Sequence, residues 1–287
     1  MLLVLGLAPV ALAAEPTFDK ATPMDDMPAA ETKLSAQVGG NFTTGNAESV
    51  TVTGGLDTSH RWKRNRLGAV AAINVGFGAV DVNADGFLDE SERCIRVEGK
   101  DCASTAERYG ADLRYDRFLS SRDSLYLLGG ALHDPFVGFE LRSHVQLGYA
   151  RLLVNEADTH LALEAGADVA HEQYVEGLVP ASTNLVAAQV ALKFDHVFNE
   201  GVSFADALVV YEPILTQPEG AAFSPHFTDF RVSNVATLAA KVSTKLSVNV
   251  SDTVEFRNEP IAPPEGVTGT RSPIDNTLSV ALVASIL

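Results

Sequence analysis

Apolar and polar residues alternate along most of this chain from residue 34 onward. Between residues 34 and 43 every even position is apolar or glycine, and the odd positions carry Ser, Gln, Gly, Asn and Thr. A period of two is typical of a β-strand whose two faces meet different surroundings, and no helical period fits it. Twelve such runs predict strands at 34–44, 47–61, 65–79, 105–119, 122–133, 138–153, 158–174, 184–198, 203–213, 229–242, 246–259 and 274–287.

In four of these runs the polar face carries charged side chains. The pattern does not assign the faces of 122–133, 184–198 and 203–213, where apolar residues are mixed. In a closed barrel, charged side chains can line the interior, where pairing across strands offsets the cost of removing them from water. Structural pairing and solute selectivity are both open as their main role. The predicted lumen residues are Arg108, Asp112, Arg114, Asp116, Glu140, Arg142, His144, Glu164, Asp168, Glu255 and Arg257.

The lengths of the runs and of their connections favour a barrel that crosses a membrane. A tilted strand needs about 9 to 11 residues to cross a bilayer, and most runs reach that length. Connections after even-numbered runs are short, whereas those after odd-numbered runs are usually longer, as in barrels with periplasmic turns and extracellular loops. We therefore predict an all-β fold, a 12-stranded antiparallel transmembrane β-barrel over 34–287, with an extracellular loop insertion at 80–104. A secreted β-sandwich, which also alternates, is the alternative.

Composition and charge exclude other classes of protein. The chain has 287 residues, of which 46% are hydrophobic, too many for a disordered protein. No stretch reaches the roughly 18 unbroken apolar residues that a membrane-spanning helix needs. Lys and Arg number 21 against 37 Asp and Glu, and the resulting net charge of −16 argues against a nucleic-acid partner.

The N-terminal segment indicates export. Residues 1–13 are apolar, too short to span a bilayer, and end in Ala11-Leu12-Ala13, a pattern that signal peptidases cleave after. We predict a signal peptide at 1–13, with a buried N-terminal helix as the alternative. Residues 14–33 contain three prolines and several acidic residues, which predicts a flexible periplasmic segment before the barrel.

One motif within 80–104 predicts a specific chemistry. Residues 81–92 match the twelve-residue calcium loop at every position that its pattern specifies, with Gly86 at the sharp turn. An acidic loop whose Asp and Gly residues only make turns is the alternative. Nothing on either side resembles the paired helices of a regulatory EF-hand, so we expect a static structural site of about 10⁻⁴ to 10⁻³ M affinity. The predicted Ca²⁺ ligands are Asp81, Asn83, Asp85, Phe87 through its carbonyl, Asp89 and Glu92.

The two cysteines of the chain, Cys94 and Cys102, follow this loop closely. In an exported protein such a pair predicts a local disulfide. Two free thiols, or a metal site built on the two cysteines, are the alternatives.

Several short motifs follow one another along the chain, at 44–46, 107–110, 115–120, 135–142, 148–149 and 276–280. Taken in their order, they resemble the DUF481 family, also called the salt-induced outer membrane protein family. The resemblance covers about 34–287 and implies an outer-membrane β-barrel of a diderm bacterium that the barrel-assembly machinery inserts. It does not imply an enzymatic activity.

These observations predict a bacterial outer-membrane protein that is not an enzyme and whose partners are outer-membrane lipid and a small solute. We expect a narrow channel or an envelope-integrity protein with a structural Ca²⁺ site. A calcium-dependent, phospholipase-like lipid hydrolase is the alternative from another class, although no Ser, His and acid arrangement fits the alternation. A barrel that binds a partner at the cell surface is the remaining alternative.

Overall fold

The alternating runs form β-strands throughout. A computed structural model of the chain describes residues 30–43, 49–79, 102–227, 229–259 and 272–286. No helix within these ranges is long and apolar enough to cross a membrane. The strands are β1 (Glu31–Thr43), β2 (Ser49–Trp62), β3 (Asn65–Gly78), β4 (Ala103–Phe118), β5 (Asp123–Asp134), β6 (Phe139–Asn155), β7 (Thr159–Tyr174), β8 (Ser182–Asn199), β9 (Val202–Pro218), β10 (Ser224–Pro225), β11 (Arg231–Lys241), β12 (Leu246–Arg257) and β13 (Ile274–Ser285).

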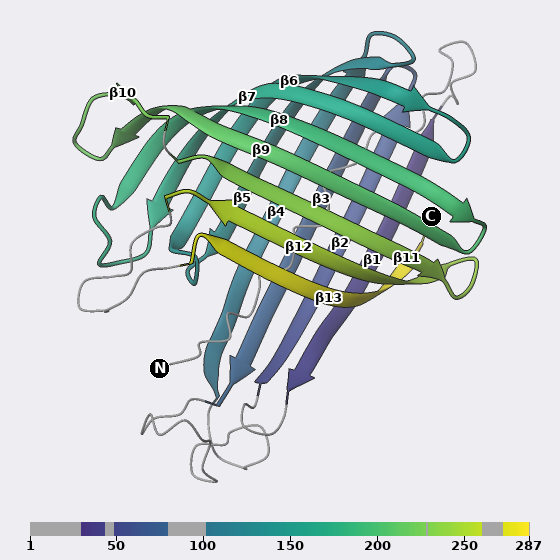
Figure 1. Cartoon of the computed structure of the whole chain (residues 1–287), viewed down its shortest axis with the longest axis horizontal. Helices are drawn as coiled ribbons and strands as arrows, with labels where there is room; N and C mark the ends of the chain where they lie inside the picture. Colours follow the sequence, from purple (N-terminus) through teal and green to yellow (C-terminus); the bar gives the residue numbers. More distant parts are fainter. Residues whose placement is uncertain (1–29, 44–48, 80–101, 228, 260–271, 287) are drawn as a thin grey trace.

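Twelve of these strands form a closed antiparallel barrel. Each long strand pairs with its neighbour in sequence, β9 pairs with both β8 and β11, and β13 pairs with β1. The two-residue strand β10 only extends one end of β9. Figure 1 shows β6 to β9 and β11 to β13 on the near wall, with β1 to β5 crossing behind them. The predicted all-β, twelve-stranded antiparallel barrel is therefore confirmed.

Closure of the barrel provides hydrogen-bond partners for backbone groups of the first and last strands. β1 pairs with β13 over five residues, from Ser35 opposite Ser285 to Gly39 opposite Ala281. On its other side β1 pairs with β2 over its whole length. An unpaired edge would leave amide and carbonyl groups without partners in lipid, so this closure is what a spanning barrel requires.

The connections differ at the two ends of the barrel. At one end, which we call the short-turn end, the strands join at 63–64, 119–122, 156–158, 200–201 and 242–245. At the other, the long-loop end, the connections include 79–102, 219–230 and 258–273. The predicted signal peptide and the predicted calcium ligands lie outside the described residues. Strand β1 begins at Glu31, so the end of the predicted flexible segment 14–33 belongs to the barrel.

The outer face of the barrel is apolar and the inner face holds the charges. Leu113, Val145 and Leu147 are 54, 56 and 63% exposed, whereas Arg114 and Glu164 are 0 and 1% exposed. A soluble protein has the opposite distribution, and a membrane barrel has this one. Two outward carboxylates are hydrogen-bonded to the next strand: Asn234 donates to Asp206, and Asn276 to Asp252, each at 3.0 Å.

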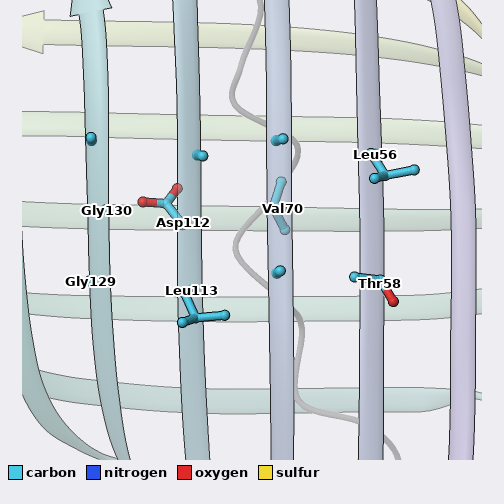
Figure 2. Close-up of a pocket in the computed structure, with 11 residues that line it drawn as sticks. Leu56, Thr58, Val70, Asp112, Leu113, Gly129 and Gly130 are labelled. Carbon is cyan, nitrogen blue, oxygen red and sulfur yellow. The ribbon is translucent and has the colours of Figure 1, made fainter.

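A shallow groove marks the outer face of β2 to β5. Its sides are Leu56 of β2 and Leu113 of β4, and small residues such as Ala69, Ala71 and Ala111 lie between them. Figure 2 shows Leu56 and Leu113 on either side of the strand that carries Val70. The groove is therefore a surface feature facing away from the barrel interior.

Candidate functional site

Charged side chains from strands that are not neighbours meet inside the barrel. Arg114 of β4 contacts Glu164 of β7, and Arg108 of β4 lies 3.8 Å from Glu255 of β12. Strands this far apart in the sheet order can exchange side-chain contacts only through the interior. The inner face of β4, β6, β7 and β12 carries ten of the eleven predicted lumen residues: Arg108, Asp112, Arg114, Asp116, Arg142, His144, Glu164, Asp168, Glu255 and Arg257.

The first group of interior charges lies toward the short-turn end. Both terminal nitrogens of Arg114 donate to the Glu164 carboxylate, at 2.9 and 3.0 Å, and its Nε donates to Asp116 at 3.0 Å. Arg66 donates to the same Asp116, and Lys193 donates to Glu164 at 3.1 Å. We call these five residues the short-turn cluster. Three cations face two carboxylates, and bidentate pairing of this kind is the strong form of a charged hydrogen bond.

An aromatic side chain supports this cluster. The Tyr126 ring lies under the Arg114 guanidinium, 4.1 Å from its central carbon to the ring centroid, and Gln146 donates to the Tyr126 hydroxyl. The adjacent strands β6 and β7 carry Gly148 and Gly166 beneath the ring. A Cβ at Gly148 would lie 2.3 Å from Tyr126, and one at Gly166 would lie 2.8 Å from its hydroxyl. These glycines are what lets the tyrosine lie flat across two strands.

A second group occupies the middle of the barrel. The Nε2 of His144 lies 3.3 Å from Asp112, and its Nδ1 lies 3.0 Å from Asp168. The hydroxyl of Tyr211 donates to the other oxygen of Asp168 at 3.0 Å. The chain of contacts joins β4, β6, β7 and β9, and it holds His144 between two carboxylates.

The third group, the long-loop cluster, lies toward the other end. Glu172 accepts from Arg231 at 2.8 Å and lies 3.4 Å from Arg142. Asp229, just before β11, accepts from Arg231 and from Arg257. The guanidinium groups of Arg142 and Arg231 both contact the Tyr211 ring, with their central carbons 5.2 and 5.5 Å from its centroid. Arg108, which also lies 3.6 Å from Asp134, extends these contacts across the barrel to Glu255.

The faces predicted for Phe139 and Glu140 are wrong. With Glu140 predicted to face the lumen, strict alternation places Phe139 on the outer face, yet Phe139 is 4% exposed and lies under Arg257 inside the barrel. Glu140, expected in the lumen, is exposed. The reason is a β-bulge: Phe139 pairs with Tyr174 and Leu141 with Gln173, so Glu140 is the extra residue. A bulge reverses the faces on one side of it, which a strict period of two cannot anticipate.

Half of the interior is filled and the other half is lined by short side chains. On the β4 to β8 side, apolar residues such as Leu128, Leu152 and Leu185 are fully buried beside the charges. On the other side many inner residues are short, polar and half-buried, although Thr51, Arg61 and Thr253 are buried, and Arg231, Glu255 and Arg257 have long side chains. The short, half-buried residues include Ser35, Gln37 and Gly39 of β1, Thr53 and Ser59 of β2, Thr237 of β11, Ser247, Asn249 and Ser251 of β12, and Ser279 of β13.

Several functional residues were missing from the prediction. Arg66 and Lys193 complete the short-turn cluster, and Glu172, Asp229 and Arg231 complete the long-loop cluster. Arg66 and Glu172 could have been found by extending the alternation to the ends of their strands. Asp229 and Arg231 alternate with Phe230 and Val232 at the start of the predicted run 229–242, so the same extension would have found both, although Asp229 itself precedes β11.

The calcium and disulfide predictions are not tested by this geometry. The residues of the predicted calcium loop and Cys94 lie outside the described residues, so both remain predictions. Within the described part of the chain, no group of three or more His, Cys, Asp or Glu residues is arranged to hold a metal ion.

The sequence can now be compared with known proteins. The family model described as "Protein of unknown function, DUF481" matches residues 36–285. The chain belongs to the DUF481 family. This confirms the resemblance seen in the sequence motifs. No curated protein matches this DUF481 chain.

Solved barrels are similar to this DUF481 protein at low identity. The NanC porin has 10% identity and a TM-score of 0.48, covering 88% of this chain and 100% of that one. An outer membrane channel from Pseudomonas putida F1 has 12% identity and a TM-score of 0.48, covering 95% and 99%. The KdgM porin, in complex with disordered oligogalacturonate, has 8% identity and a TM-score of 0.42, covering 90% and 100%. These are similarities between barrels and concern architecture alone.

The histidines of this DUF481 barrel lend no support to the hydrolase alternative. Both ring nitrogens of His144 face carboxylates, which leaves neither nitrogen to accept a proton from a serine. His160 forms a pair with Asp195 at 2.7 Å, but it is 4% exposed within the filled half of the barrel. A substrate would have to displace packed side chains to reach it.

Proposed function

We propose that this DUF481 protein is a narrow outer-membrane channel for small polar solutes. The passage runs along the inner faces of β1, β2 and β11 to β13. The observation that carries the proposal is the division of the interior. Many short, half-buried polar side chains line this wall between Arg61 at the short-turn end and Glu255 and Arg257 at the long-loop end, whereas bulky paired side chains fill the opposite wall. Hydroxyl and amide groups can replace the hydrogen bonds that a solute makes with water.

The outer surface supports the membrane location. Exposed leucine and valine side chains surround the barrel, and aromatic side chains lie toward the strand ends, as at Trp62, Tyr115 and Tyr109. Aromatic side chains at both interfaces are typical of membrane barrels. By the rule that turns are periplasmic and loops extracellular, the short-turn end faces the periplasm.

The buried charges support a structural role for the filled half. Side chains that are 0 or 1% exposed cannot line a water-filled pore, so Arg114, Asp116 and Glu164 act as a rigid support for the passage. Barrels of this size lie between small barrels filled by side chains and wide porins. A passage limited to one wall therefore admits small solutes and excludes large ones.

Single-channel recording in planar bilayers tests this proposal with a matched pair of variants. Ser251→Trp adds an indole to the passage wall, and we expect it to lower the conductance. Val250 is the adjacent residue, lies on the outer face and is 39% exposed. Val250→Trp adds the same group there, and we expect this variant to conduct like the unmodified barrel. Inserted protein that gives no current, or equal conductance of the two variants, would contradict the proposed passage.

We propose further that the loop at 81–92 binds one Ca²⁺ ion on the extracellular side. The support is the sequence pattern, in which Asp81, Asn83, Asp85, Asp89 and Glu92 supply the hard oxygen ligands that this ion prefers. Millimolar calcium should protect the loop of the refolded barrel from protease. Asp81→Ala with Glu92→Ala should abolish that protection, and equal cleavage of both proteins in calcium would disprove the site.

A further inference from the structure

Exposed cations gather along one part of the short-turn end. Lys63 and Arg64 form the β2–β3 turn, Arg117 is the last residue but one of β4, Arg122 lies in the β4–β5 turn, and Arg151 lies in β6. We call these five residues the basic rim. All five are exposed, and Arg151 is 55% exposed as a side chain.

The basic rim stands out against the charge of the chain. The protein has a net charge of −16. At this rim, however, five cations lie beside a single carboxylate, that of Asp123. Two of the other short turns are acidic, with Glu156 and Asp158 after β6 and Glu200 after β8, while the remaining turn has Lys241 and Lys245 beside it. The basic rim is therefore the largest group of exposed cations at the short-turn end.

The strand register makes the rim continuous. The carbonyl of Arg64 accepts a hydrogen bond from the amide of Phe118 at 2.9 Å, which places this turn beside the end of β4. Asp123 pairs with Arg151, and the carbonyl of Arg122 accepts from the amide of Leu152 at 2.8 Å. With strands about 4.8 Å apart, the rim covers roughly 15 Å from β3 to β6.

Neighbouring side chains hold two of the arginines in position. Arg117 donates to the side-chain oxygen of Asn65 at 2.8 Å, and the Tyr115 hydroxyl donates to the same oxygen. Arg151 donates to Asp123 at 3.3 Å, and the Tyr149 hydroxyl donates there too. A guanidinium has five N–H donors, so each arginine keeps donors for an external anion.

Aromatic and aliphatic side chains continue from the rim toward the middle of the barrel. Trp62 is the single tryptophan of the chain, and its ring centroid lies 6.4 Å from that of Tyr115. Leu67 and Leu125, 40 and 45% exposed, lie on the same outer face. Cations, then aromatic rings, then exposed leucines reproduce the order of headgroup, interface and acyl chain in a lipid leaflet.

We propose that the basic rim is a binding site for the headgroup of an anionic phospholipid in the periplasmic leaflet. The positive charge complements the headgroup phosphate, and the arginine geometry allows paired hydrogen bonds to its oxygens. A soluble anion would gain nothing from the adjoining leucines, whereas a phospholipid places its chains against them. The inference rests on the membrane location proposed above.

Trp62 supplies a reporter within the rim itself. The full-length barrel is refolded into phosphatidylcholine vesicles that contain either brominated phosphatidylglycerol or brominated phosphatidylcholine, and the bromine quenches tryptophan fluorescence at contact. We expect stronger quenching by the anionic lipid, with a preference of about five-fold for each cation that contacts the headgroup. The preference should fall as salt is added.

Paired variants test whether the preference for the anionic lipid comes from the basic rim. Arg117→Gln with Arg151→Gln should bring the two lipids close to equal quenching, and Arg122→Gln alone, in an exposed turn, should lower the preference about five-fold. Lys241→Gln with Lys245→Gln removes two exposed cations from the far side of the same end and should leave the preference unchanged. Equal quenching by both lipids in the unmodified barrel would overturn the headgroup site alone. Absence of quenching by either lipid would overturn the membrane location as well.

Discussion

Arg114 illustrates how much a single interior residue depends on its partners. Its side chain is 0% exposed, it donates to two carboxylates, and it covers an aromatic ring. Alternation alone predicted that Arg114, Asp116 and Glu164 would face the interior. It could not predict that Arg114 pairs with Glu164, because that contact depends on how far β4 lies from β7 across the closed barrel.

The Arg114 and Glu164 pair should show strong coupling. Arg114→Gln or Glu164→Gln alone leaves a buried charge short of its partner and should cost about 3 to 5 kcal/mol of unfolding free energy. The double variant should cost less than the sum of the two by about 1 to 3 kcal/mol. Urea unfolding of the barrel in lipid vesicles measures all three values.

An exposed pair provides the control for this cycle. Glu31 and Lys33 lie 3.7 Å apart with side chains 44 and 48% exposed, and their coupling should be below about 1 kcal/mol. If the Arg114 and Glu164 pair showed coupling as small as this, water would reach the short-turn cluster, and the idea of a filled half would be wrong.

The strands whose faces the sequence left unassigned share one cause. β5 carries Tyr126 and Leu128 inward, and β8 carries Leu185 inward, although the outer faces of both strands are also apolar. Where the interior is filled by apolar side chains, both faces of a strand are hydrophobic and the period of two disappears. In β4 and β7, in contrast, the inner face carries charged residues and the outer face apolar ones, so the alternation is clear.

Strand irregularities account for the remaining difference between prediction and structure. The bulge at Glu140 shifts the register of β6 against β7, and another shift occurs between Leu152 and Val154. Such extra residues depend on both partner strands, so one sequence run does not reveal them. The starts and ends of the twelve strands, in contrast, lie within three residues of the predicted ones, except that β9 continues to Pro218 where the prediction ended at 213.

The whole barrel divides its tasks between its faces. The outer face is apolar, the basic rim gathers exposed cations at one end, the β4 to β8 interior is filled, and the opposite interior wall carries many short, half-buried polar side chains. Each region is assembled from several strands. The alternation along the chain therefore identifies a barrel, while the position of the proposed passage emerges only after the barrel closes.

The contact between Arg108 and Glu255 should set the width of the passage at the long-loop end, because it joins two strands on opposite sides of the barrel. Arg108→Ser with Glu255→Ser removes both side chains of this pair. Asp134→Asn is made in the same background, because Asp134 also contacts Arg108 and its buried carboxylate would otherwise lose its cation, and we expect a higher single-channel conductance. Glu107→Ser changes the adjacent residue and should leave the conductance unchanged. If the triple variant conducted like the unmodified barrel, the narrowest point would lie elsewhere along the passage. The size of the side chain at Ser251 would then be varied next.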